Sequence, residues 1–134
     1  VVRNPYSTRP YQHVLEPVFA YLMIAAEQYL DNNKAGFYNV GPDEVDCYQT
    51  GNLVDIFVRK WGDDLKWSCQ YDGGPHEANF LKLDCSKVKA VFNWKPHWNL
   101  EKALEMTVEW SKCWTAKGDI RQCMDKQIDE FLEN

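Results

Sequence analysis

An arginine near the start of the chain is the residue whose type and setting best suit chemistry. Arg9 lies on a segment that also holds Pro5 and Pro10, directly before a stretch with helical periodicity. A guanidinium on a rigid loop can grip a phosphate through two charge-assisted hydrogen bonds. A helix start at this point would add backbone N–H donors and a positive dipole end. From the residues alone, the simpler interpretation is a surface arginine that pairs with Glu16 or with a helix end.

A glycine-rich segment later in the chain is the second candidate. Residues 73–78 read GGPHEA, and glycines permit tight turns and close approach of the backbone to a ligand. His76 and Glu77 can donate to and accept from ribose hydroxyls or a phosphate. A hairpin turn with solvated polar residues accounts for the same letters. A third candidate is Asn39 in YNVG, although an asparagine before a turn glycine usually serves the turn itself.

The elements that must position these residues follow from the apolar spacing. Between His13 and Leu30 the apolar residues recur at helical spacing over more than one face, which predicts a helix covered on two sides. Helices are also predicted over 49–61, over a short stretch that ends at Asn93, from an Asn99 cap to Gly118, and from an Asp119 cap onward. We expect a loop over 4–10 and strands over 36–40, 65–71 and 79–83, with residues 1–3 ending another strand. The fold class is therefore α+β and helix-rich, in one domain (1–134) without an internal linker.

The stretch 81–110, LKLDCSKVKAVFNWKPHWNLEKALEMTVEW, carries a family resemblance. A short helix, a W-x-P break and a long helix ending in Glu-Trp follow one another, and proline disfavours helix in the residue before it. This order resembles the C-terminal end of the extended short-chain dehydrogenase/reductase family, which acts on nucleotide-activated sugars. RPYQHVLEP (9–17), and HEA (76–78) with LKLDCSK (81–87), are similar to the CDP-glucose 4,6-dehydratase branch.

The resemblance implies a set of substrate-binding residues. It implies that Arg9 contacts the nucleotide diphosphate and that the 73–78 loop, with His76 and Glu77, borders the nucleotide. Asn39 would border the same pocket, and His13 is a further candidate, although a histidine at this place more often serves the helix start.

The 73–78 loop also departs from the family pattern. Many dTDP-sugar relatives carry an arginine just before the proline of this loop, where Gly73 and Gly74 precede Pro75 here. Phosphate neutralisation would then rest on Arg9, with Arg3 as a helper. Trp67, Trp94 and Trp98 could stack on a pyrimidine, but each is more simply a core residue.

The resemblance also implies what the chain lacks. The sequence has no glycine-rich dinucleotide turn, and none of its seven tyrosines has a lysine four residues later. The family's Rossmann-type NAD-binding domain and its Tyr-x-x-x-Lys pair would lie in an absent N-terminal domain. In the parent enzyme, NAD would take a hydride from C4, water would leave across C5 and C6, and the hydride would return to C6. We expect this chain to hold the CDP-sugar, to bind neither NAD nor metal, and to be inactive alone.

The composition argues against several other classes of function. A net charge of -5 argues against a nucleic-acid interface, and no apolar run is long enough to span a membrane. Five cysteines without a CxxC pair favour reduced thiols in a cytoplasmic protein over a zinc site or a disulfide framework. We expect the helix over 13–30 to expose apolar surface and to drive self-association. The alternatives are a same-fold epimerase, another sugar dehydratase, or a non-enzymatic interaction module.

Overall fold

The computed structural model describes residues 1–70 and 79–133, and most of its regular structure is helical. The helices are α1 (Leu15–Leu30), α2 (Thr50–Trp61), α3 (Ser86–Phe92), α4 (Leu100–Thr115) and α5 (Ile120–Leu132), with short 3-10 turns at Asn32–Lys34 and Glu44–Asp46. Strands β1 (Thr8–Pro10) and β2 (Cys47–Gln49) form an antiparallel pair. The predicted α+β, helix-rich class is confirmed.

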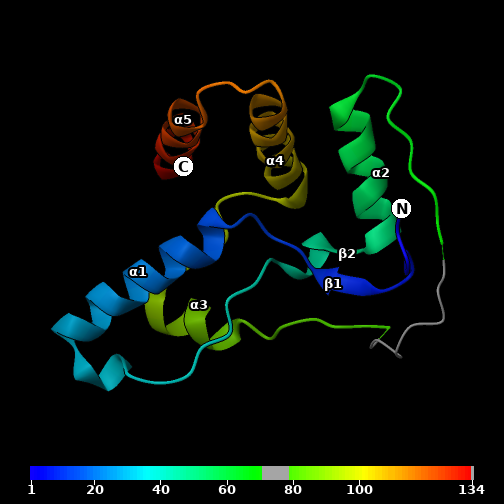
Figure 1. Ribbon diagram of the computed structural model, residues 1–134. Helices are drawn as coiled ribbons and strands as arrows, with labels where there is room; N and C mark the ends of the chain where they lie inside the picture. Colours follow the sequence, from blue (N-terminus) through cyan, green and yellow to red (C-terminus); the bar gives the residue numbers. More distant parts are fainter. Residues whose placement is uncertain (71–78, 134) are drawn as a thin grey trace.

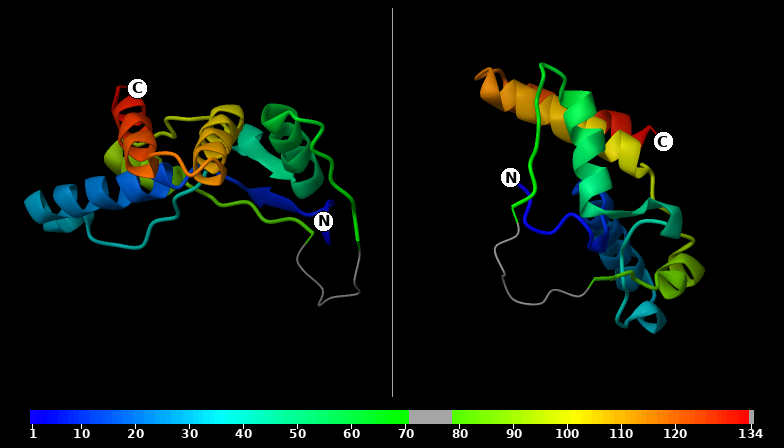
Figure 2. Two further views of the ribbon diagram at one scale, coloured as in Figure 1. Left: turned by 45° about the horizontal axis from the view of Figure 1, so that its top comes forward. Right: turned by 90° about the vertical axis from the view of Figure 1, so that its right-hand side faces the viewer.

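The helices form two groups, one of α2, α4 and α5 and one of α1 and α3. Helix α4 packs between α2 and α5, while α1 and α3 lie together (Figure 1). Helix α1 projects away from the rest of the chain, as the first view of Figure 2 shows. Three clusters of buried residues hold the groups together, centred on Ala20 with Val88 and Trp94, on Ile56 with Leu100 and Leu104, and on Trp98 with Met106 and Phe131.

The helix ends lie where their capping residues predict them. The Asn99 side chain accepts the Lys102 N–H at 2.9 Å at the start of α4, and Asp119 accepts the Gln122 N–H at 3.0 Å at the start of α5. Helix α3 ends at Asn93, whose φ of 51° lies in the left-handed region that terminates helices. These boundaries depend on a few adjacent residues, so the sequence alone predicts them.

The predicted strands are wrong in their extent. Residues 36–40 form no strand, and the segments 65–70 and 79–83 contribute only single bridges, Cys69 to Val2 and Phe80 to Thr8. The N-terminal strand likewise reduces to the bridge at Val2. Conversely, β1 forms within the predicted loop 4–10. A strand requires a neighbour to take its backbone hydrogen bonds, and apolar alternation does not show where that neighbour lies.

Helix α1 is covered on one side by the described residues. Ala20 is fully buried against α3, whereas Val14, Tyr21 and Leu22 are more than half exposed. The expected apolar exposure of this helix is therefore present, and among the described residues no second layer covers its other side. Within the part of the chain that the structure describes, no helix combines the length and apolarity that crossing a bilayer demands.

Candidate functional site

Strand β1 carries Arg9 between two segments that are far apart in sequence. On one side Arg9 lies opposite Tyr48 of β2. On the other side the Thr8 N–H donates to the Asn79 carbonyl at 2.9 Å, and the Leu81 N–H donates to the Thr8 carbonyl at 3.1 Å. The strand is therefore held along both edges, and the backbone that presents Arg9 has a fixed position.

The backbone next to each arginine of the N-terminal segment bonds to a described segment further along the chain, residues 68–70 in one case and residues 79–81 in the other. Val2, next to Arg3, donates its N–H to the Ser68 carbonyl at 2.9 Å and accepts the Gln70 N–H at 3.0 Å. Thr8, next to Arg9, bonds to residues 79 and 81 as described above. His76 and Glu77 lie outside the described residues. The backbone beside Arg3 is therefore bonded to residues 68 and 70, and the backbone beside Arg9 to residues 79 and 81.

Arg9 is a half-buried cation on this strand. Its Nη1 donates to the Thr8 carbonyl at 2.8 Å, which keeps the guanidinium close to the backbone of β1. A guanidinium held in this way loses less side-chain entropy when it binds a phosphate, because part of its freedom is already lost in the fold.

A hydroxyl network fixes β1 to the start of α2. Thr50 Oγ1 donates to the Ser7 carbonyl at 3.1 Å and lies 2.7 Å from the Tyr11 hydroxyl. The first N–H groups of α2 are also used within the chain: Thr50 donates to Ser7 at 3.0 Å and Gly51 donates to the Pro5 carbonyl at 2.8 Å. This helix start therefore orients β1, and its first donors are occupied.

The start of α1 is likewise satisfied from within. His13 Nδ1 accepts the Leu15 N–H at 3.3 Å, and the His13 carbonyl accepts the Glu16 N–H at 3.1 Å. The expectation that this helix start supplies N–H donors to a phosphate is therefore wrong for these two groups. The Leu15 and Glu16 N–H groups are therefore used within the chain, whereas the Arg9 side chain and the helix dipole still favour a phosphate near this segment.

Glu16 is a buried acidic residue whose structural role the sequence analysis does not predict. It is fully buried, and its Oε1 accepts the His97 N–H at 2.9 Å and the Trp98 N–H at 2.7 Å. Burial raises the pKa of Glu16, while the two backbone hydrogen bonds and the nearby His97 ring oppose that rise. The carboxylate thereby joins the first turn of α1 to the W-x-P turn. No sequence signal distinguishes it, since a glutamate in a first helical turn is ordinary.

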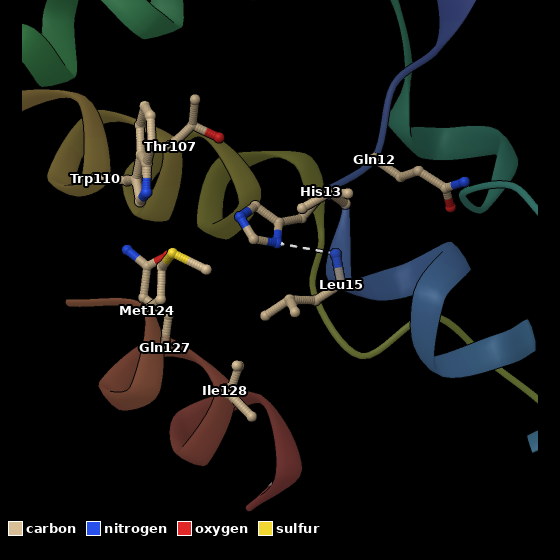
Figure 3. Close-up of a pocket in the computed structure, with 9 residues that line it drawn as sticks. Gln12, His13, Leu15, Thr107, Trp110, Met124, Gln127 and Ile128 are labelled. Atoms are coloured by element: carbon tan, nitrogen blue, oxygen red, sulfur yellow. Dashed lines mark hydrogen bonds between the residues drawn. The ribbon is translucent and has the colours of Figure 1, made fainter. Parts of the chain in front are cut away.

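A pocket of ≈ 450 Å³ lies between the start of α1 and the helices α4 and α5 (Figure 3). His13 forms one wall, with Trp110 of α4 and Met124 and Ile128 of α5 opposite. Because its Nδ1 accepts a hydrogen bond, a neutral His13 carries its proton on Nε2. Burial lowers the pKa of His13, which favours that neutral form. The pocket is mainly apolar, and His13 is the one residue of its lining that the sequence analysis names as a candidate.

The remaining described candidates are not among the residues that line this pocket. Asn39 is exposed and its Nδ2 donates to the Asp84 carbonyl at 3.1 Å. The neighbouring Val40 carbonyl accepts a hydrogen bond from Gln12 Nε2 at 3.3 Å, which connects this segment to the link between β1 and α1.

The tryptophan candidates serve the fold. Trp94 and Trp98 are buried core residues, as the simpler interpretation predicts. Trp67 is half-buried and donates to Asp55 at 2.8 Å. Across residues 1–70 and 79–133 no cluster of potential metal ligands occurs.

Nearly the whole chain is similar to part of a known enzyme. The chain is 39% identical over 133 residues to a CDP-glucose 4,6-dehydratase of Salmonella typhimurium. The match covers 98% of this chain and the C-terminal 37% of that protein. The chain thus spans well under half the length of this relative. No protein-family model matches the sequence. The resemblance to the C-terminal part of this group of enzymes is confirmed.

Proposed function

We propose that this chain is the C-terminal, nucleotide-sugar-binding part of a CDP-glucose 4,6-dehydratase. In this proposal Arg9 contacts the diphosphate of the CDP-sugar, assisted by Arg3. His76 and Glu77 contact the nucleotide from the 73–78 loop. Asn39 and His13 are further substrate-binding candidates. The enzyme is a cytoplasmic lyase of deoxysugar biosynthesis, and its catalytic residues lie outside this chain.

The observation that carries this proposal is the 39% identity to that dehydratase, which extends over 98% of the chain. The position of Arg9 adds support from geometry. A half-buried guanidinium on a strand held at both edges suits a ligand that needs one fixed positive group. The net charge of -5 leaves an anionic ligand dependent on such local cations.

The residues present do not fit NAD. A dinucleotide is held by a glycine-rich turn at a helix start, and the sequence contains no such turn. The first N–H groups of α2 are also occupied by the carbonyls of Ser7 and Pro5. In the proposal, NAD and the chemistry that it performs belong to the N-terminal part of a longer enzyme. This chain binds and orients the nucleotide end of the substrate.

The exposed apolar face of α1 also supports the proposal that this chain is one part of a longer enzyme. Tyr21 and Leu22 are 61% and 67% exposed, and Tyr29 and Leu30 at the far end of the helix are 89% and 80% exposed. Apolar patches of this kind are normally covered by a partner. We place the NAD-binding part against this face. When the chain is alone, a second copy would cover the same surface.

A domain exchange tests the proposal directly. The C-terminal 37% of the Salmonella typhimurium dehydratase is replaced with this chain, and turnover is measured with CDP-glucose and with other nucleotide sugars. We expect activity on CDP-glucose. A chimera that is folded and retains NAD but acts on another nucleotide sugar would identify an epimerase or a different dehydratase. A folded chimera that binds no nucleotide sugar would favour an interaction module.

A further inference from the structure

Two cysteines face each other across the junction between α4 and α5. In this antiparallel pair, Gln127 of α5 donates to the Met106 carbonyl of α4 at 2.9 Å and to Glu109 Oε2 at 3.3 Å. Continuing that register one turn toward the connection brings Cys113, near the end of α4, opposite Cys123 in the first turn of α5. Figure 1 shows the two helices side by side up to their connection.

The connection between the helices is closely packed on this pair. The Gly118 N–H donates to the Cys113 carbonyl at 2.9 Å, and a Cβ at Gly118 would lie 2.9 Å from Cys113 Sγ. The glycine therefore lets the connection turn directly over the Cys113 thiol. Gln127 Nε2 lies 3.8 Å from Cys123 Sγ on the other side.

The two thiols also interact with each other. Burial is the main cause that raises the pKa of Cys123, followed by the neighbouring thiol of Cys113 and by Glu109, so Cys123 reacts as a thiolate more readily at alkaline pH. Both cysteines are free and only half-buried, so small reagents can reach them. The other partly accessible thiols, Cys47 and Cys69, lie on different elements.

We propose that Cys113 and Cys123 form a reversible disulfide under attack by a hydroperoxide, closing the α4–α5 junction. One thiolate attacks the O–O bond, which yields a sulfenic acid and an alcohol, or water when the oxidant is hydrogen peroxide. The second thiol then attacks that sulfur and expels water. Both cysteine sulfurs are oxidised and the peroxide is reduced. A dithiol reductant reverses the reaction by exchange.

The disulfide would act on the pocket that the same helices border. Trp110 lies one turn before Cys113 and Met124 directly follows Cys123, and both line that pocket. The closed pair would fix the spacing of α4 and α5 at this end and restrict any adjustment of the pocket. Closing a short loop also removes entropy from the unfolded chain. This inference is independent of the proposed substrate.

Peptide mapping of the oxidised chain tests the proposal. The chain is treated with hydrogen peroxide, alkylated with N-ethylmaleimide and digested with trypsin, which releases residues 113–117 and 122–126 as separate peptides. We expect these peptides to be joined, two hydrogens lighter than the sum, and separable by dithiothreitol. Alkylation of both cysteines should fall at least tenfold. Two separate peptides, with both thiols alkylated or each singly oxidised while exposed Cys69 has reacted, would overturn the proposal.

Single-site variants provide the matched controls. In Cys113→Ser, Cys123 should be trapped as a sulfenic acid that dimedone labels. In Cys123→Ser, dimedone should label Cys113 in the same way. Oxidation should raise Tm of the wild type by about 5 °C or more, and of neither variant. Cys69→Ser should behave like the wild type. If Cys69→Ser abolished the cross-linked peptides, the linkage would run through the exposed cysteine and the proposal would be wrong.

Discussion

Glu16 and Arg9 belong to one short N-terminal stretch, yet the fold encloses them very differently. Glu16 is fully buried and holds two N–H groups of the W-x-P turn, more than 80 residues further along the chain. Arg9 is half-buried on a three-residue strand. Glu16 Oε1 thus joins two distant parts of the chain, whereas the Arg9 guanidinium donates a hydrogen bond to the adjacent Thr8 carbonyl, on a strand that β2 and residues 79–81 flank.

The contrast separates a charge that joins two parts of the fold from a charge that we propose binds a ligand. A buried carboxylate is costly unless hydrogen bonds replace its lost hydration. Here two backbone donors bind Oε1, while Oε2 has no hydrogen-bond partner among the described residues, and burial raises the pKa of Glu16. A half-buried arginine retains part of its hydration and can exchange it for a phosphate at small cost. Substitution of Glu16 should therefore lower the stability of the fold, whereas substitution of Arg9 should weaken ligand binding.

The largest effect should come from Glu16→Ala. The His97 and Trp98 N–H groups would stay buried without acceptors, and the first turn of α1 would lose its link to the W-x-P turn. We expect the free energy of unfolding to fall by about 2–4 kcal/mol, as measured by urea denaturation. Glu133→Ala, which removes an exposed carboxylate, is the control and should change it by less than about 0.5 kcal/mol. Equal effects of the two substitutions would show that Glu16 is not a structural anchor.

A smaller effect concerns the apolar face of α1. Leu22→Glu places a charge on a side chain that is 67% exposed, so the fold of the chain should be retained. We expect self-association of the isolated chain to weaken about tenfold, measured by sedimentation velocity over a concentration series. Asn52→Glu adds the same charge at an exposed position of α2 and should leave association unchanged. A wild-type chain that stays monomeric at high concentration would contradict the expected self-association.

The smallest effect is a pH dependence that belongs to Glu16. Burial raises its pKa in the folded chain, so the unfolded chain releases this proton at a lower pH. The free energy of unfolding should therefore fall as pH rises from the ordinary carboxyl range through the raised pKa of Glu16. Glu16→Gln keeps an acceptor for both N–H groups and should lack this component. Denaturation curves across that range, with His97 present in both proteins, measure the difference, and parallel pH profiles would contradict the assigned pKa shift.

What the sequence predicts depends on how local the cause is. The caps Asn99 and Asp119 and the left-handed Asn93 act on neighbouring residues, and the helix ends that they predict are confirmed. Strand pairing joins distant segments, so β1 was missed, and residues 36–40 were predicted as a strand that the described chain does not form.

The candidate site follows the same rule. Arg9 was identified from its residue type and from the resemblance, which both act at the level of sequence. Its place on a strand between β2 and residues 79–81 could not be predicted, because those partners come from other parts of the chain. The burial of Glu16 depends in the same way on the turn at His97 and Trp98.

The most direct test of the account compares two ligands in one substituted enzyme. Arg9→Ala is introduced into the chimera with the Salmonella typhimurium dehydratase, and binding of CDP-glucose and of NAD is measured by calorimetry, with exposed Arg121→Ala as the control. Loss of a charge-assisted contact should cost about 1.5–3 kcal/mol, or about ten- to a hundredfold in affinity for CDP-glucose, with NAD binding unchanged. Equal weakening of both ligands would mean that Arg9 maintains the fold, and unchanged CDP-glucose binding would remove Arg9 from the substrate site.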